Sequence, residues 1–569
     1  MPANTAILFH PEAFDTNSPT LMGRHAAGEG FLKAWARHAG HERLYCYIQQ
    51  APHADAFLQV AASAGWRGQV EGIGWDNPAA LAGPGGLFIP GPGLDRQAWF
   101  RHSHGLSHAY SLVGITHTTA SAMALDDIGS LLTGPVEEWD AVICTSEAVR
   151  SMVERTLTDQ LNHLRQRLGV TGTPSAPRLP QLPVIPLGVD CDQFTPRPAA
   201  RQAWRERLGI AAADVAVLFM GRLSFHAKAH PVAMYKAMQA ALPSLPAGAR
   251  LHLIEAGWFG NDAIREAFDA AATLHCPNIV RHVVDGRQAD ARQEIWHAAD
   301  IFCSLSDNIQ ETFGLTPVEA MAAGLACVVS DWNGYKETVR DGIDGMRIPT
   351  WMPQAGMGAD FALYHAMGFL EYDLYCGAAC QFVAVDIARA TDAFRALIAD
   401  PALRRRMGEA GRAHARARFD WRVVIPAYQT LLSGLEARRT AARQARGEGP
   451  RRAGTWPLRA DPFHAFAHYS THHPDADVRV ALAPDSTTAD LDGLLSGAMV
   501  RYAAPLLPKR ADMAHVIATL SAAGGMMTVA GLLNTVPAGR KGFFLRSLPF
   551  MAKHGLLLLA PPDGPRGPA

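Results

Sequence analysis

The stretch that decides the fold runs from residue 300 to residue 331 and reads DIFCSLSDNIQETFGLTPVEAMAAGLACVVSD. Two short apolar runs, DIFCSLS and LACVVSD, flank a polar loop and a helical segment, TPVEAMAAG. Strand, loop, helix and strand in that order make one unit of a parallel sheet covered by helices. Ligands of such sheets bind beyond the carboxyl ends of the strands, so the loop DNIQETFGL is the first place to look for a site.

The same alternation extends over about the first 430 residues. TAILFH, GLFIPGPG, SLVGITHT and WDAVICTS read as earlier strands, and EGFLKAWARHAG reads as a helix. The pattern breaks near residue 175 in the proline-rich TGTPSAPRLPQLPVIPLGVD, which favours a linker. A second series then begins with VAVLFMGR and continues through ARLHLIEAG and NIVRHVV. The sequence therefore predicts two separate α/β domains that face each other across a cleft.

We place the first domain at residues 1–185 and the second at 186–437, with final helices that can cross back to the first domain. Residues 438–456 are arginine-rich and read as a linker. Residues 457–569 contain two short helices joined through Gly-Gly, then a third helix that runs into an apolar strand. That order is typical of a winged-helix-like module.

The third helix of this module carries few cations for a DNA reader: Arg540, Lys541, Arg546 and Lys553. Residues 511–560 are therefore expected to dock a protein partner in preference to DNA. The chain of 569 residues has a formal net charge of -1, which gives no general attraction to nucleic acid or acidic surfaces.

No stretch approaches the ~20 apolar residues of a membrane span, and no basic segment followed by a long apolar run opens the chain. The eight cysteines contain no CxxC pair. Reduced, mostly buried thiols in a cytoplasmic protein are the expected reading.

The loop and helix after DIFCSLS carry two glutamates, Glu311 and Glu319. Thr316, with Glu319 three residues later, has the signature of a capping box, which would explain Glu319 structurally. The helix start would also offer free N–H groups around Gly314, Leu315 and Thr316 to a phosphate. Glu311 has no such local role, and a solvated loop glutamate is its structural alternative.

A second motif, VLFMGRLSFHAKAHP, places Arg222 and Lys228 after the strand that ends at Gly221. Arginine can donate two hydrogen bonds to a diphosphate, and lysine adds a point charge. Both would be ordinary surface cations if they did not lie at a strand end in the domain that holds the glutamates.

GRLSFHAK, together with the segment from ARQEIWHAADIF to DGIDGMRIP, resembles the C-terminal half of the retaining family 4 glycosyltransferases, which have the GT-B arrangement of two Rossmann-like domains. WDAVICTSEAVR and LPVIPLGVDCDQFTP resemble the end of the N-terminal domain and the linker of that family. The resemblance covers about residues 5–435 and is strongest from 182 to 350.

The resemblance implies a donor site for a nucleotide-diphosphate sugar. Arg222 and Lys228 would hold the diphosphate and stabilise the leaving group, and Glu311 would contact the transferred sugar. Glu319 would bind the ribose, and His117 would lie beside the donor sugar from the opposite domain. The resemblance further implies backbone contacts to donor oxygens from Gly314, Leu315 and Thr316, and a Gly-rich approach to the diphosphate in GRHAAGEGF through Gly28 or Gly30.

The sequence departs from the pattern of this family at two places. Lys228 is one residue further from the arginine than is usual, which leaves a displaced lysine, with His226 or His230 sharing its role, as an alternative. Residues 351–382 replace a short connection of the family and read as a lid, an interface or an acceptor element.

The expected activity is metal-free transfer of a sugar, with retention of anomeric configuration, to an unknown acceptor. Cations and N–H dipoles would stabilise the developing phosphate charge, so no cofactor is expected. Asp190 and Asp192 form a DxD-like pair, but they lie in the linker, where a structural role is favoured over metal binding. Two alternatives stay open: a GT-B epimerase or phosphorylase-type enzyme, and a regulatory protein that senses a nucleotide sugar and acts through the C-terminal module.

Overall fold

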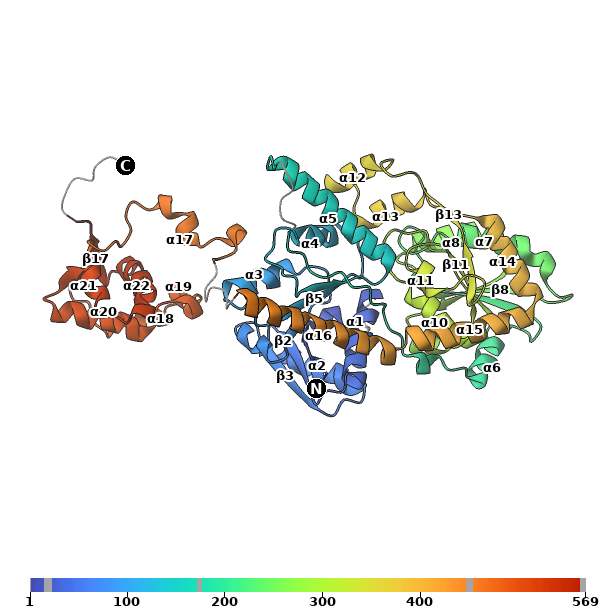
Figure 1. Cartoon of the computed structure of the whole chain (residues 1–569), viewed down its shortest axis with the longest axis horizontal. Helices are drawn as coiled ribbons and strands as arrows, with labels where there is room; N and C mark the ends of the chain where they lie inside the picture. The colour runs from blue at the N-terminus through green and yellow to red at the C-terminus, as the bar shows by residue number, and fades with distance from the viewer. Residues whose placement is uncertain (1, 15–22, 171–176, 447–453, 563–569) are drawn as a thin grey trace. The chain divides into compact units, whose positions relative to one another are not determined.

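The computed structural model describes residues 2–14, 23–170, 177–446 and 454–562; of residues 23–25 and 446 it describes only the secondary structure. The chain forms two compact units, Met1–Trp456 and Pro457–Ala569. The first unit, coloured blue to orange in Figure 1, contains two parallel sheets.

The first sheet has six parallel strands in the order β3-β2-β1-β4-β5-β6. Its strands are β1 (Ala6–Leu8), β2 (Arg43–Ile48), β3 (Gln69–Gly74), β4 (Gly86–Phe88), β5 (Ser111–Ile115) and β6 (Ala141–Ile143). The helices of this domain are α1 (Gly23–His38), α2 (Pro52–Ser63), α3 (Asp95–Ser103), α4 (Ala122–Ser130) and α5 (Glu147–Arg167). The strand order reverses between β1 and β4, so the crevice at their carboxyl ends is where such a sheet binds ligands.

The second sheet repeats this topology in the order β12-β11-β10-β7-β8-β9. Its strands are β7 (Val215–Met220), β8 (Leu251–Gly257), β9 (Val280–Asp285), β10 (Ile301–Ser304), β11 (Ala326–Ser330) and β12 (Gly345–Ile348). Its helices are α6 (Pro198–Arg207), α7 (Val232–Ala241), α8 (Asp262–His275), α9 (Ala289–Glu294), α10 (Leu315–Ala323), α11 (Tyr335–Thr338), α14 (Ile387–Ala399) and α15 (Pro401–Arg418). Here the reversal lies between β7 and β10, which are the strands that precede the two motifs singled out in the sequence.

The long helix α16 (Trp421–Arg446) returns to the first domain and packs on α1 and β5. Gln429 donates to the carbonyl of Ala39, and the buried Arg439 donates to the carbonyl of Gly85 and to the Ser111 hydroxyl. Residues 438–446, predicted as linker, are helical. The hydrogen bonds of Arg439 to buried acceptors hold this part of α16 on the first domain. Residues 447–453 of the predicted linker lie outside the described residues.

Residues between β12 and α14 form an excursion whose two ends are held by an antiparallel pair, β13 (Thr350–Trp351) with β14 (Ala384–Val385). The excursion contains α12 (Ala359–Ala366) and α13 (Tyr372–Cys380). The excursion contains residues 351–382, which were predicted to form a lid, an interface or an acceptor element.

The second unit holds a three-stranded antiparallel sheet in the order β16-β15-β17, from β15 (Arg479–Leu482), β16 (Met526–Thr528) and β17 (Leu557–Ala560). Its helices are α17 (Pro462–Ala465), α18 (Asp490–Ser496), α19 (Ala498–Arg501), α20 (Arg510–Ala522), α21 (Val529–Leu533) and α22 (Lys541–Lys553). A separate small core includes Val480, Val516 and Leu548.

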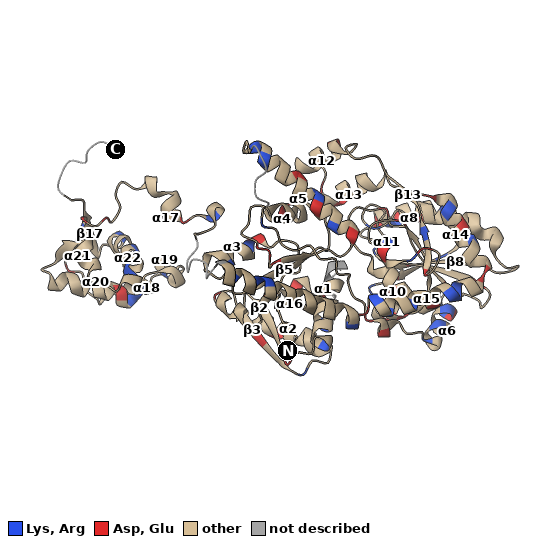
Figure 2. Cartoon of the chain, in the orientation of Figure 1, with Lys and Arg blue, Asp and Glu red and all other residues tan. Residues whose placement is uncertain are grey.

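The predicted fold class is confirmed: the chain has two Rossmann-like α/β domains and an additional C-terminal α+β region. Basic and acidic side chains are interspersed over its helices (Figure 2), in keeping with the net charge of -1. All eight cysteines are buried and unpaired. Among the described residues, no helix is both long and apolar enough to span a bilayer.

Candidate active site

The two predicted motifs meet at the carboxyl edge of the second sheet. Lys228, in the loop after β7, places its Nζ 2.6 Å from Oε2 of Glu311, in the loop after β10. The longer spacing between Arg222 and Lys228 thus does not turn the lysine away from the glutamate. Their side chains are 22% and 11% exposed, so the ion pair is largely removed from water.

Each partner of this pair keeps the other charged. Burial acts to raise the pKa of Glu311, but the Lys228 ammonium and the N–H groups of Phe313 and Thr312 outweigh it and lower the pKa. Burial likewise acts to lower the pKa of Lys228, and the Glu311 carboxylate reverses that effect. The pair therefore presents one fixed cation and one fixed anion to any ligand at this edge.

Helix α10 begins at Leu315, and its N-cap residue is Gly314 in the left-handed region, with φ of 92°. No side chain caps the helix, so the predicted capping box of Thr316 and Glu319 is wrong. The physical reason lies at Gly314, where an added Cβ would come within 2.1 Å of the Tyr335 ring. Only glycine fits there, and the turn it makes carries Thr316 past the cap position into the first turn.

Glu319 consequently has no structural partner within the described residues: no hydrogen bond or ion pair engages its carboxylate. Burial raises its pKa to about 7, while Lys228 and Arg292 act in the opposite direction. A carboxylate in this state is held ready for a donor that the protein itself does not supply.

Arg222 is half-buried beside this pair, and its positive charge acts to lower the pKa of Lys228. Its guanidinium donates one hydrogen bond, to the carbonyl of Ala227 at 3.3 Å. Among the described side chains no carboxylate pairs with it. Arg222 therefore keeps donors available for an anion.

The first domain meets this loop through the end of β5. The carbonyl of His117 accepts a hydrogen bond from the Thr312 hydroxyl at 3.2 Å, and the Ser146 hydroxyl donates to the carbonyl of Thr312 at 2.8 Å. His117 also lines an open pocket with His10, Glu12, Ala13 and Pro90 at the carboxyl ends of β1, β4 and β5. His117 thus lies between its own domain's crevice and the loop that carries Glu311.

Gly28 and Gly30 lie inside α1 rather than in a loop. An added Cβ at Gly28 would meet the carbonyl of Ala13 at 3.3 Å, and one at Gly30 would meet the Trp421 ring at 3.5 Å. Both glycines let neighbouring elements pack closely on the helix. Their predicted contact with a diphosphate stays a prediction.

Sequence reasoning missed Asp307 and Gly257. Asp307 follows β10, accepts a hydrogen bond from the backbone N–H of His230 at 3.2 Å, and has its pKa raised by burial to about 7. A Cβ at Gly257 would meet the carbonyl of Gly221 at 1.9 Å, so the ends of β7 and β8 come together only as glycine backbone. Asp307 could have been found from its position at the end of a predicted strand, and Gly257 could have been found as a glycine that follows an apolar run.

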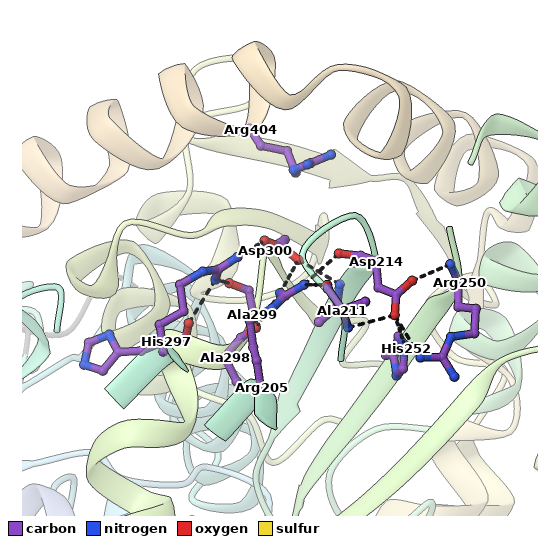
Figure 3. A network of polar contacts seen from close by, with 12 residues as sticks. Arg205, Ala211, Asp214, Arg250, His252, His297, Ala298, Ala299, Asp300 and Arg404 are labelled. Atoms are coloured by element: carbon purple, nitrogen blue, oxygen red, sulfur yellow. Dashed lines mark hydrogen bonds and ion pairs between the residues drawn. The ribbon is translucent and has the colours of Figure 1, made fainter. Parts of the chain in front are cut away.

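A second polar cluster lies at the opposite, amino-terminal edge of the second sheet (Figure 3). Asp214 accepts hydrogen bonds from the backbone N–H groups of Ala211 and Arg250 and from His252, and Asp300 accepts from Arg205. These contacts fix the loops that lead into β7, β8 and β10. Within the described residues, no three His, Cys, Asp or Glu side chains gather as metal ligands.

Comparison with known proteins finds a family model that matches part of the second domain. Residues 210–359 match the model of the family described as glycosyl transferases group 1, and this segment contains Arg222, Lys228, Glu311 and Glu319. A D-inositol 3-phosphate glycosyltransferase of Geodermatophilus obscurus is 30% identical over 233 residues, which cover 40% of this chain and 50% of that protein. A phosphatidyl-myo-inositol mannosyltransferase of Mycobacterium tuberculosis is 30% identical over 241 residues, covering 42% and 50%. The chain thus spans about half the length of the curated relatives it matches.

Among solved structures, Anabaena HepE in complex with UDP and glucose is similar with a TM-score of 0.45 and 16% identity, over 76% of this chain and 99% of that one. The sucrose-phosphate synthase of Thermosynechococcus elongatus gives a TM-score of 0.42 and 16% identity, over 76% and 99%.

Proposed function

We propose that the chain is a glycosyltransferase that moves a sugar from a nucleotide-diphosphate sugar to an acceptor. One observation carries the proposal. At the carboxyl edge of the second sheet, Arg222 and Glu319 flank the Lys228–Glu311 pair, and within the described part of the chain no anion pairs with Arg222 and no donor reaches Glu319. A ligand that carries both phosphates and hydroxyl groups complements all four side chains.

In this proposal Arg222 and Lys228 contact the donor diphosphate, and the N–H groups at Gly314, Leu315 and Thr316 add their dipoles. Positive charge fixed in place before the reaction stabilises the charge that develops on the leaving phosphate. Lys228 has three donors, so it can keep Glu311 while it reaches a phosphate oxygen. No cofactor or metal is needed for that stabilisation.

Glu311 accepts hydrogen bonds from hydroxyls of the transferred sugar, and Glu319 accepts them from the ribose. His117, with Gly28 and Gly30, completes the donor site from the first domain. The bond from the anomeric carbon to the phosphate oxygen breaks, and the acceptor oxygen bonds to that carbon on the same face. The acceptor proton passes to the leaving phosphate oxygen, and the configuration is retained because the new bond forms on the face that the leaving group departs from. Closure of the two domains excludes water and favours transfer over hydrolysis.

The names of the relatives support this activity class, since both are glycosyltransferases, and two of the solved neighbours were obtained with UDP or UDP and glucose. We further propose a cytoplasmic enzyme whose C-terminal unit is a winged-helix-like module that docks a protein partner. In that unit Arg540 pairs with Asp512, and Arg546 lies over the Phe543 ring, so these two cations of residues 511–560 are already engaged.

The test is thermal stabilisation of the purified protein by UDP-, GDP- and ADP-sugars, because a ligand that binds only the folded state raises its stability. We expect one nucleotide class to raise the melting temperature of the wild type and to leave Arg222→Ala unchanged. Arg250→Ala, which removes a cation at the amino-terminal edge of the same sheet, is the matched control and should respond as the wild type does. Equal stabilisation of the wild type and Arg222→Ala would reject the assigned donor site.

A further inference from the structure

Helix α13 of the excursion between β13 and β14 forms a wall beside the proposed donor loop. Its buried face consists of Cys376, Gly377 and Cys380. A Cβ at Gly377 would come within 2.8 Å of the His226 Cβ, so the helix packs against the backbone of the loop that joins Arg222 to Lys228. Cys380 adds a contact from its Sγ to the carbonyl of Phe225 at 3.7 Å.

Tyr372, the first residue of α13, reaches both domains. Its hydroxyl lies 2.9 Å from Oε1 of Gln310 and 3.3 Å from Oγ1 of Thr118. Gln310 immediately precedes Glu311, and Thr118 immediately follows His117. One hydroxyl therefore touches the neighbours of two proposed site residues that come from different domains.

The hydrogen bonds have a consistent direction. The Thr118 hydroxyl accepts from the backbone N–H of Ala120 at 3.4 Å, which leaves its proton for Tyr372. Burial raises the pKa of Tyr372 to about 12, so its hydroxyl is protonated at neutral pH and donates to Gln310. Gln310 is itself held by its backbone N–H, which donates to Oδ1 of Asn308 at 3.0 Å, and Asn308 is anchored on the carbonyl of His226 at 2.7 Å.

We propose that Tyr372 is a positioning residue: its hydroxyl bridges Thr118 of the first domain and Gln310 of the donor loop, and so holds the two domains closed around the donor. This inference rests on the proposed function. The bridge is available only while the end of β5 lies against the loop after β10. Opening of the domains breaks the Thr118 bond and leaves the bond within the second domain.

A bridge of this kind acts on the population of the closed form. If the donor binds only the closed form, its apparent affinity falls in proportion to the fraction of molecules that are closed. Once the donor saturates the enzyme, all molecules are closed and the turnover rate is unchanged. One hydrogen bond corresponds to about a two- to tenfold change in the ratio of closed to open molecules. The apparent affinity changes by the same factor when the open form predominates in the free protein.

The experiment uses the full chain and the hydrolysis of whichever of UDP-glucose, GDP-mannose and ADP-glucose stabilises the wild type. We expect Tyr372→Phe and Thr118→Val each to raise KM by about two- to tenfold with kcat within about twofold, and the double variant to do no more than either alone. Tyr375→Phe is the matched control, since this tyrosine of the same helix stacks on His365 and its hydroxyl makes no hydrogen bond within the described residues. A wild-type KM for Tyr372→Phe, or additive effects of the two variants, would overturn the proposal.

A second readout needs no nucleotide. Amide hydrogen exchange of the free protein should become faster in Tyr372→Phe at residues 116–120 and 308–313 together, and stay unchanged in Tyr375→Phe. Unchanged exchange at residues 116–120 would reject the bridge even if no nucleotide sugar bound. Faster exchange there without nucleotide binding would retain the bridge and reject the proposed donor.

Discussion

Replacing Glu319 with glutamine should stabilise the folded protein at alkaline pH. The side chain lies at the proposed donor site, and no group of the described structure donates to it. Burial raises its pKa from 4.5 to about 7, so the folded state holds a proton that the unfolded state has lost over that interval. Stability contributed by this group is present below pH 4.5, falls as pH rises toward 7, and stays low above it.

The size of the effect follows from the two pKa values. A rise from 4.5 to about 7 corresponds to roughly 3 kcal/mol of unfolding free energy at pH 8. Glu319 keeps part of its surface exposed, and solvent reduces that figure, so we expect about 1–3 kcal/mol. For a domain of this size that is a rise of roughly 2–4 °C in melting temperature for each kcal/mol.

The assay is the unfolding free energy of the wild type and Glu319→Gln at pH 5, 6, 7 and 8, from urea denaturation. The difference between the two should grow with pH across this range, because all other titrating groups cancel. Glu409→Gln, at an exposed position of α15, is the matched control and should show no such growth. A difference that is independent of pH, or a glutamine variant less stable than the wild type at pH 8, would refute the reasoning.

Two further predictions concern the same edge of the sheet. Glu311→Ala leaves Lys228 largely buried without its anion and should cost about 3–5 kcal/mol, and Lys228→Met should recover part of this loss in a double-mutant cycle; additive losses would mean that the two side chains are not coupled. Gly314→Ala places a Cβ against the Tyr335 ring and should cost clearly more than the ~1–2 kcal/mol expected for Gly342→Ala, where φ is 72° but nothing lies within 4 Å; equal melting temperatures would show that the ring moves aside freely.

The strands were predictable where apolar runs end in glycine or a polar residue. DIFCSLS and VAVLFMGR became β10 and β7, and parallel strands bring their carboxyl ends to one edge, so Glu311 and Lys228 had to lie near each other. The local start of α10 was not predictable in the same way. A Thr-Pro pair followed by glutamate fits a capping box, and the competing demand of Tyr335 on Gly314 comes from a residue 21 positions further along the chain.

Long-range packing accounts for the other features that the sequence did not predict. Nothing in GRHAAGEGF shows that Gly30 lies in a helix on which Trp421 packs, and the predicted approach of Gly28 or Gly30 to a diphosphate stays a prediction. Tyr372 gave no signal, since its meaning comes from Thr118 and Gln310, two positions far away in sequence. These contacts depend on how the two domains and the excursion pack together, and the local periodicity of the sequence does not encode this packing.

Two buried ion pairs elsewhere in the fold provide a comparison for the charged side chains of the proposed donor site. Buried Arg101 forms two hydrogen bonds with Asp140, and Glu255 pairs with Arg281, because a buried charge without a partner costs several kcal/mol. At the carboxyl edge of the second sheet, two charged side chains lack such a partner among the residues that the structure describes: Glu319 has no hydrogen-bond donor, and the half-buried Arg222 has no anion. The two exceptions have opposite charge and lie around one ion pair, yet Glu319 and Arg222 do not pair with each other. A ligand that brings an anion to Arg222 and hydroxyl donors to Glu319 accounts for both.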